Sequence, residues 1–177
     1  APHPDDETLG CGGLIARLVA MGRRITVVIA TDGGRCQLSR YRDRNEVVRL
    51  RQQEAIAACA ELGLPRPELI FLGLPDGELA GRSSELSQQL LRIAQATSAG
   101  TIVAPYVHEM HPDHVALSEA ARILANAIPG CRYLEYPVWL SRRMALRISI
   151  AGRSPAPIRK LPLVAAIDAK RRAIGHY

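Results

Sequence analysis

Residues 25–34 read Ile-Thr-Val-Val-Ile-Ala-Thr-Asp-Gly-Gly, and this stretch decides the fold class. Its first part, Ile25–Thr31, is short and rich in β-branched residues, so it predicts a strand rather than a helix. Upstream, apolar residues recur at helical spacing over 14–19 until Gly22 stops them. Downstream, residues from about 40 to 62 predict a long charged helix. A strand with a helix on each side is the repeating unit of α/β proteins.

The same alternation continues along the rest of the chain. It predicts an α/β fold, specifically a Rossmann-like three-layer sandwich with a mainly parallel central sheet. Ser83 or Ser84 is the expected N-cap of the helix that carries the apolar face of residues 86–94. The remaining expected strands are 69–72, 101–104, 133–138 and 145–150, and the remaining expected helices cover 117–128 and 163–175.

Length and composition limit the class of protein. With 177 residues the chain fits one domain, which we expect to span residues 1–177. The chain opens on a loop-like motif at Ala1 and stops abruptly at Tyr177, so we expect this domain to be trimmed at both ends. A hydrophobic content of 47% excludes a wholly disordered chain. The longest apolar run, Ala55–Ala60, is far below the roughly 20 residues of a membrane span, so no membrane partner is expected.

The four cysteines show no metal-knuckle or disulfide pattern. They are widely spaced, and none forms a C-x-x-C pair. Reduced thiols of an intracellular protein explain this pattern, so the expected location is cytoplasmic.

The chain opens with an acidic cluster beside a histidine, His3-Pro4-Asp5-Asp6-Glu7. Like charges this close raise one another's pKa, and a divalent cation relieves the repulsion. Histidine and carboxylate form a normal zinc ligand pair, and Pro4 stiffens the link so that His3 and Asp6 can converge while Asp5 points elsewhere. An acidic, solvated turn that caps the following helix explains the same residues equally well.

A second cluster, His-Glu-Met-His-Pro-Asp-His, occupies residues 108–114. Three of the five histidines of the chain fall within these seven residues, directly after an expected strand. The simpler alternative is that Asp113 caps the next helix and that the histidines are incidental. The presence of the first cluster favours a shared metal site over this alternative.

The two clusters together hold the parts of a metal hydrolase. A catalytic zinc needs three protein ligands and an open fourth position, and His3, Asp6 and His114 would supply two nitrogens and one oxygen. Asp5 and His111 are then left over. A metal hydrolase needs two such groups, one to deprotonate the water and one to stabilise the oxyanion and the leaving group.

These motifs resemble those of the LmbE-like/PIG-L zinc-dependent N-deacetylases. The paired His-Pro-Asp-Asp-Glu and His-Pro-Asp-His motifs carry the resemblance. The family includes enzymes that remove acetate from N-acetylglucosamine joined to inositol, malate or other aglycones. Further pieces follow in the family's order at residues 12–13, 31–34, 51–54, 62–63 and 74–77.

The resemblance implies a role for each residue of the two clusters. His3, Asp6 and His114 would hold the metal, and Asp5 would be the general base. His111 would be the electrophile or acid that faces the amide oxygen and the leaving nitrogen. The metal would be zinc, although two histidines and one carboxylate also accommodate iron(II).

Three further roles follow from the same resemblance. Asp113 would orient or tune His111, Arg51 would contact substrate, and Asp76 would reach sugar hydroxyls. A solvated position on a charged helix is the alternative interpretation of Arg51. For Asp76 the alternative is a residue of a Pro-Asp-Gly turn.

We therefore expect a metal-dependent hydrolase that removes the N-acetyl group from an N-acetylglucosamine-type conjugate. The alternatives are a metal-dependent phosphoesterase, or a nucleotide- or sugar-binding module without catalysis. The net charge of +6 would suit nucleic acid, but aromatic residues make up only 4%, and single-stranded nucleic-acid grooves rely on stacking. The arginines after Gly33-Gly34 fit an anionic sugar conjugate better than nucleic acid, although ordinary solvated surface positions explain them more simply than either. No nucleic-acid partner is expected, and a homo-oligomer is compatible with the sequence.

Overall fold

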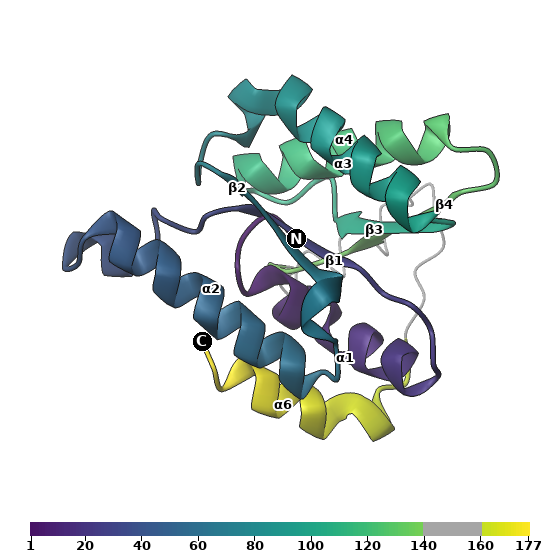
Figure 1. Cartoon of the computed structure of the whole chain (residues 1–177), viewed down its shortest axis with the longest axis horizontal. Coiled ribbons are helices and arrows are strands. Elements are labelled where there is room, and N and C mark those ends of the chain that lie inside the picture. Colours follow the sequence, from purple (N-terminus) through teal and green to yellow (C-terminus); the bar gives the residue numbers. More distant parts are fainter. Residues whose placement is uncertain (140–160) are drawn as a thin grey trace, which may run out of the picture.

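Helices and strands alternate through most of the chain in a computed structural model that describes residues 1–139 and 161–177. The expected strand at 145–150 lies outside these described residues. Figure 1 shows the elements, which are α1 (Asp6–Ala20), β1 (Val27–Thr31), α2 (Arg44–Glu61), β2 (Leu69–Leu74), α3 (Ser83–Thr97), β3 (Thr101–Pro105), α4 (Pro112–Ala127), β4 (Arg132–Tyr136) and α6 (Ile167–Ile174). Short 3-10 turns lie at η1 (Gln37–Arg40), η2 (Arg66–Glu68), η3 (Leu79–Arg82) and η4 (Val164–Ala166).

The described strands form two parallel pairs. β1 pairs with β2 with Val27 opposite Leu69, and β3 pairs with β4 with Thr101 opposite Arg132. The backbone N–H groups of β1 also donate to the first residues of the chain, from Ala30 to the Ala1 carbonyl at 2.9 Å. The next bond of this series runs from the Thr31 N–H to the Pro2 carbonyl at 2.8 Å. The predicted α/β class with parallel pairing is confirmed.

Helices gather in two groups on either side of the strands (Figure 1). Helix α6 contacts both α1 and α2, and α3 contacts α4. Aliphatic side chains fill the space between helices and strands, as the scarcity of aromatic residues requires. Ile29 of β1 and Leu62 after α2 lie in the core on the α1–α2–α6 side, and Leu79 and Leu86 lie in the core beside α3 and α4.

Local chemistry sets where the helices begin. Helix α2 starts at Arg44 rather than near residue 40, because the Asp43 side chain accepts the backbone N–H of Asn45 at 2.9 Å and caps the helix there. The expected serine cap of α3 is wrong. The turn η3 leads directly into α3, so Ser83 already has helical backbone angles and Arg82 occupies the cap position without a side-chain hydrogen bond.

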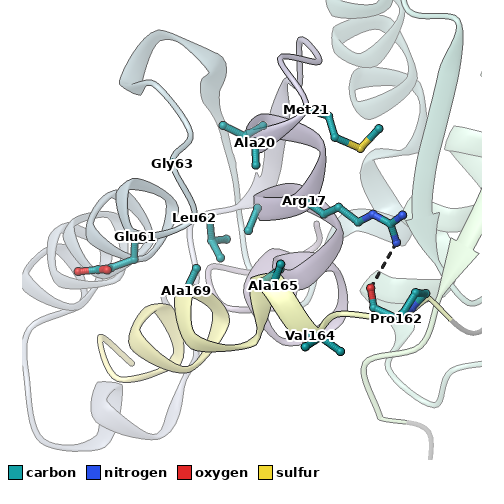
Figure 2. A pocket seen from close by; sticks show the side chains of 13 residues that line it. Arg17, Ala20, Met21, Glu61, Leu62, Gly63, Pro162, Val164, Ala165 and Ala169 are labelled. Atoms are coloured by element: carbon teal, nitrogen blue, oxygen red, sulfur yellow. Dashed lines mark hydrogen bonds between the residues drawn. The ribbon is translucent and has the colours of Figure 1, made fainter.

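A cavity of about 770 Å³ lies between α1, the end of α2 and the segment leading into α6 (Figure 2). Arg17 crosses its edge and donates a hydrogen bond to the Pro162 carbonyl at 3.3 Å. None of the residues predicted to carry chemistry lines this cavity. Among the residues described, no helix has both the length and the apolar character that crossing a bilayer requires.

The core assignment predicts a clear difference between two leucines of α3. Leu86 is fully buried, whereas Leu91 is 41% exposed on the same helix. Leu86→Ala should lower the free energy of unfolding by about 2–5 kcal/mol, since it removes buried methyl groups and leaves a cavity. Leu91→Ala, the matched control, should change it by about 0.5 kcal/mol or less. Urea denaturation measures both, and equal effects would contradict the assignment.

Candidate metal centre

The site forms where the first turns of α1 and α4 meet. The chain leaves the hydrogen bonds beside β1 at Pro2, and α1 begins four residues later at Asp6. Helix α4 begins at Pro112, with His111 as its N-cap and His114 in its first turn. Two helix N-termini therefore deliver the two sequence clusters to one place.

One carboxylate oxygen joins the three predicted ligands. Oδ2 of Asp6 lies 3.0 Å from Nδ1 of His3 and 3.1 Å from Nε2 of His114. The backbone N–H of His3 donates to the same oxygen at 3.1 Å, which fixes the loop around it. Asp6 and His114 are almost completely buried. Two histidine nitrogens and a carboxylate oxygen are a donor set that zinc accepts, so the chemistry of these residues fits the predicted ion.

The charges of this cluster shift the pKa of each member. Burial alone would lower the pKa of His3, but hydrogen bonds to Asp113, Asp6 and Asp76 outweigh it and raise the pKa to about 11. Burial is likewise outweighed at His114, where Asp6 and Glu109 raise the pKa to about 9. Both histidines hold the pKa of Asp6 well below its usual range, against the effect of burial. In the absence of a metal, protons on the histidines balance the carboxylates.

His3 presents its second nitrogen to two other acids. Its Nε2 lies 3.2 Å from Oδ1 of Asp76 and 3.2 Å from Oδ2 of Asp113. Among the described residues, the ligand atoms of His3, Asp76 and Asp113 lie within 4.8 Å of one another, and so do those of His3, His111 and His114. Asp6 belongs to neither of these groups and meets the histidines through its Oδ2. Asp76 is buried against His3, so its own carboxylate is part of the cluster rather than a free turn residue.

Asp113 contacts His111 differently from the predicted arrangement. Its carboxylate accepts the backbone N–H groups of Gly77 at 2.7 Å and Leu79 at 3.1 Å, and it faces His3. Only its backbone N–H reaches His111, donating to Nδ1 at 3.2 Å. The side chain of Asp113 therefore anchors the 77–79 turn and His3, and its main chain orients His111.

His111 lies next to the two histidines of the predicted ligand set. Its ring centroid is 4.7 Å from that of His3 and 5.3 Å from that of His114. Burial and the charges of His3 and His114 lower its pKa. Because Nδ1 accepts a hydrogen bond, the proton of the neutral ring is placed on Nε2.

Glu109 is a functional candidate that the sequence analysis did not single out. Its carboxylate pairs with Nδ1 of His114 and also accepts the backbone N–H groups of Val138 and Trp139, the latter at 3.1 Å. Such a carboxylate fixes the tautomer of a ligating histidine, and here it would leave Nε2 of His114 for the predicted ion. The available signal was an acidic residue two positions before His111.

Asp5 occupies a strained position beside the predicted ligands. Its φ of 131° lies in a region that residues other than glycine rarely adopt, and such strain is concentrated at functional sites. Oδ2 of Asp5 accepts a hydrogen bond from Nη2 of Arg51 at 2.7 Å. Burial and the charge of Asp6 raise the pKa of Asp5 to about 6, although Arg51 opposes the shift. A carboxylate with a pKa near neutrality suits a general base.

Arg51 is buried and paired, so its interpretation as a solvated helix position is wrong. Nη1 of Arg51 donates to Glu54 at 2.7 Å, while Nη2 contacts Asp5 and the Pro4 carbonyl. The structure thus brings Arg51 to the predicted base. Its proposed contact with substrate stays a prediction.

The loops around the site are tied together by Asp32, which is buried. Its carboxylate accepts the backbone N–H groups of Gly34 at 2.8 Å and Asp76 at 3.3 Å, and it pairs with Arg44 at 2.5 Å. Other arginines that follow Gly34 are also paired, Arg35 with Glu78 and Arg42 with Glu46. Much of the positive charge near this loop is therefore already neutralised.

The chain belongs to the PIG-L family, whose model, described as GlcNAc-PI de-N-acetylase, matches residues 1–125. The resemblance drawn from the sequence motifs is confirmed by this match. Among curated relatives, the probable N-acetyl-alpha-D-glucosaminyl L-malate deacetylase 2 of Bacillus subtilis is 35% identical over 127 residues, covering 67% of this chain and 55% of the relative. The 1D-myo-inositol 2-acetamido-2-deoxy-alpha-D-glucopyranoside deacetylase of Actinosynnema mirum is 30% identical over 154 residues, covering 71% and 54%. The chain spans little more than half the length of these relatives.

Solved structures have the same fold. The conserved protein TT1542 from Thermus thermophilus is 26% identical with a TM-score of 0.72, covering 99% of this chain and 75% of that one. The N,N'-diacetylchitobiose deacetylase from Pyrococcus horikoshii is 22% identical with a TM-score of 0.73, covering 99% and 66%. At this identity the second likeness shows the fold alone.

Glu109→Gln should weaken zinc binding about 10–100-fold, because the neutral amide no longer fixes and polarises His114. Glu119→Gln is the matched control, since Glu119 is an exposed acid on α4, the helix that carries His114. Competition with a chromophoric chelator measures both affinities. Equal affinities for wild type and Glu109→Gln would contradict the assigned role.

Metal affinity should keep rising above about pH 7, where the affinity of an ordinary histidine site no longer changes. Since the pKa of His114 is raised to about 9 and that of His3 to about 11, both rings carry protons at pH 7 that an ion must displace. Affinity for zinc should therefore rise about tenfold per pH unit for each displaced proton between about pH 7 and 8.5. The same chelator competition checks this, and a flat affinity over that range would contradict it.

Proposed function

We propose that this protein hydrolyses the N-acetyl group of an N-acetylglucosamine-type conjugate, using an ion held by His3, Asp6 and His114. The observation that carries the proposal is the approach of Asp6 Oδ2 to a nitrogen of each histidine, with Asp5 and His111 left beside them. Membership of the PIG-L family supports the reaction, and the names of the malate- and inositol-conjugate deacetylases support the substrate class. The phosphoesterase and the non-catalytic binding module receive no comparable support.

Each residue has a defined task in this reaction. Zinc is the proposed ion, with iron(II) compatible with the same donors, and when bound it polarises the amide carbonyl and lowers the pKa of water toward about 7. Asp5, oriented by Arg51, takes the proton of the attacking water. His111 donates a hydrogen bond from Nε2 to the oxyanion. The proton that Asp5 took from water passes to the leaving nitrogen as the C–N bond breaks and acetate departs, which returns Asp5 to its carboxylate form.

We propose one domain with a Rossmann-like three-layer sandwich, in which the two parallel pairs share one sheet. The Ala1 backbone nitrogen donates to the Val28 carbonyl at 2.6 Å and the Ala30 N–H donates to the Ala1 carbonyl at 2.9 Å, and this pattern of a parallel neighbour on β1 supports the proposal. Helices on both sides of the strands support it as well (Figure 1).

We propose a cytoplasmic location, which the four free cysteines support because reduced thiols are typical of a reducing compartment. An anionic group on the sugar conjugate would have to engage basic side chains beyond Arg35, Arg42 and Arg44, which already form ion pairs.

Acetate release from a panel of N-acetylglucosaminides tests the function. The full chain should release acetate, lose this activity on chelation and regain it with zinc. Asp5→Ala should lower turnover at least about 100-fold while zinc content by elemental analysis stays unchanged, because the base and not a ligand is lost. Acetate release that is insensitive to metal removal, or full activity of Asp5→Ala, would contradict the proposal.

A further inference from the structure

Tyr177 contacts both groups that hold Asp5. It follows α6, and Figure 1 places this end of the chain beside α2. Its hydroxyl donates to Oε1 of Glu7 at 2.6 Å, and the guanidinium carbon of Arg51 lies 5.1 Å from the centre of its ring. The hydroxyl and the ring of one phenol make these two contacts, so a single side chain links Glu7 to Arg51.

Glu7 is a buried carboxylate held by neutral donors. It is 2% exposed, and no cationic side chain within residues 1–139 and 161–177 forms an ion pair with it. Its oxygens accept the hydroxyls of Thr8 at 2.6 Å and Tyr177 at 2.6 Å, and the backbone N–H of Asp5 at 3.0 Å. A buried carboxylate depends on such hydrogen bonds, so losing one donor leaves Glu7 free to move toward a new partner.

The hydrogen bond from Asp5 to Glu7 holds a strained backbone. A residue with a φ of 131° keeps that conformation only when its surroundings fix it from several directions. Glu7 fixes the N–H of Asp5, and the carbonyl of Asp5 accepts the N–H groups of Thr8 at 3.0 Å and Leu9 at 2.8 Å. The direction of the Asp5 side chain therefore depends on where the Glu7 carboxylate lies.

Arg51 holds the side-chain carboxylate of Asp5. Nη2 of Arg51 donates to the Asp5 carboxylate at 2.7 Å, and the ring of Tyr177 covers the guanidinium group. A cation over an aromatic face is attracted to the ring, and this contact also limits where the guanidinium can swing. Tyr177 thus acts on the backbone of Asp5 through Glu7 and on its carboxylate through Arg51.

We propose that Tyr177 is a positioning residue for Asp5, which it holds through its hydroxyl on Glu7 and its ring on Arg51. The inference rests on the proposed function, in which Asp5 is the general base. It adds a segment far along the chain to the machinery of the reaction, through contacts with Glu7 and Arg51 rather than hydrogen bonds to the predicted metal ligands.

Three variants of the full chain test the inference. Tyr177→Phe keeps the ring on Arg51 and loses the hydroxyl, and it should lower kcat about tenfold with KM within about twofold. Tyr177→Leu loses both contacts and should lower kcat up to about 100-fold, since displacing a reacting group by about 1 Å costs that much. Arg172→Ala is the matched control, because Arg172 donates to Glu61 at 2.7 Å and ties α6 to α2 without touching Asp5, Glu7 or Arg51.

The outcomes distinguish a role of Tyr177 in positioning Asp5 from a role only in packing α6 against α2. Lower kcat in both Tyr177 variants, with wild-type zinc content, and unchanged kcat in Arg172→Ala support the inference. Wild-type kcat in both Tyr177 variants, or an equal loss in Arg172→Ala, overturns it. In a Glu7→Gln background, Tyr177→Phe should lower kcat by less than about twofold further, because the hydrogen bond between these two side chains is already altered. Asp5→Ala is measured in the same assay to test the proposed function separately. If this variant stays active, the proposed function is wrong, whatever the Tyr177 variants show.

Discussion

The site depends on one buried carboxylate, Asp6, whose Oδ2 faces His3 at 3.0 Å and His114 at 3.1 Å. Burying a charge is costly unless a partner of opposite charge accompanies it. Protons on the two histidines can meet this requirement, and so can a divalent cation, which makes protons and metal competitors for the same nitrogens. Whether protons or a metal ion balance the charge, the first turns of α1 and α4 must keep their relative positions. The packing of the two helix groups around the strands therefore also determines the geometry of the site.

Around this carboxylate, each functional group is held by a second group. Glu109 holds the far nitrogen of His114, and Asp113 faces His3 while accepting N–H groups from the 77–79 turn. Arg51 holds the carboxylate of Asp5. Most of these supporting contacts join segments far apart in the chain, so they position the site only when the whole fold is formed.

The sequence predicted what local pattern determines. The β-branched stretch at 25–31 indicated β1, and the two His-Pro-Asp motifs indicated one shared site, whose residues do lie together. Arg51 was harder, because it lies among other charged residues in the first half of its helix and only the fold brings it to Asp5. The hydrogen bonds that Asp113 accepts from Gly77 and Leu79 could not be predicted either, because they join segments far apart in the sequence. The metal-binding and catalytic roles themselves stay predictions.

His3, Asp6 and His114 are proposed to hold one ion. Anomalous diffraction from crystals of the full chain grown with zinc, with data collected on either side of the zinc edge, tests it most directly. We expect a single peak with Asp6 and one nitrogen from each histidine at about 2.0–2.2 Å. A peak coordinated by Asp76 and Asp113 without Asp6 and His114 would contradict it, as would no peak at the site.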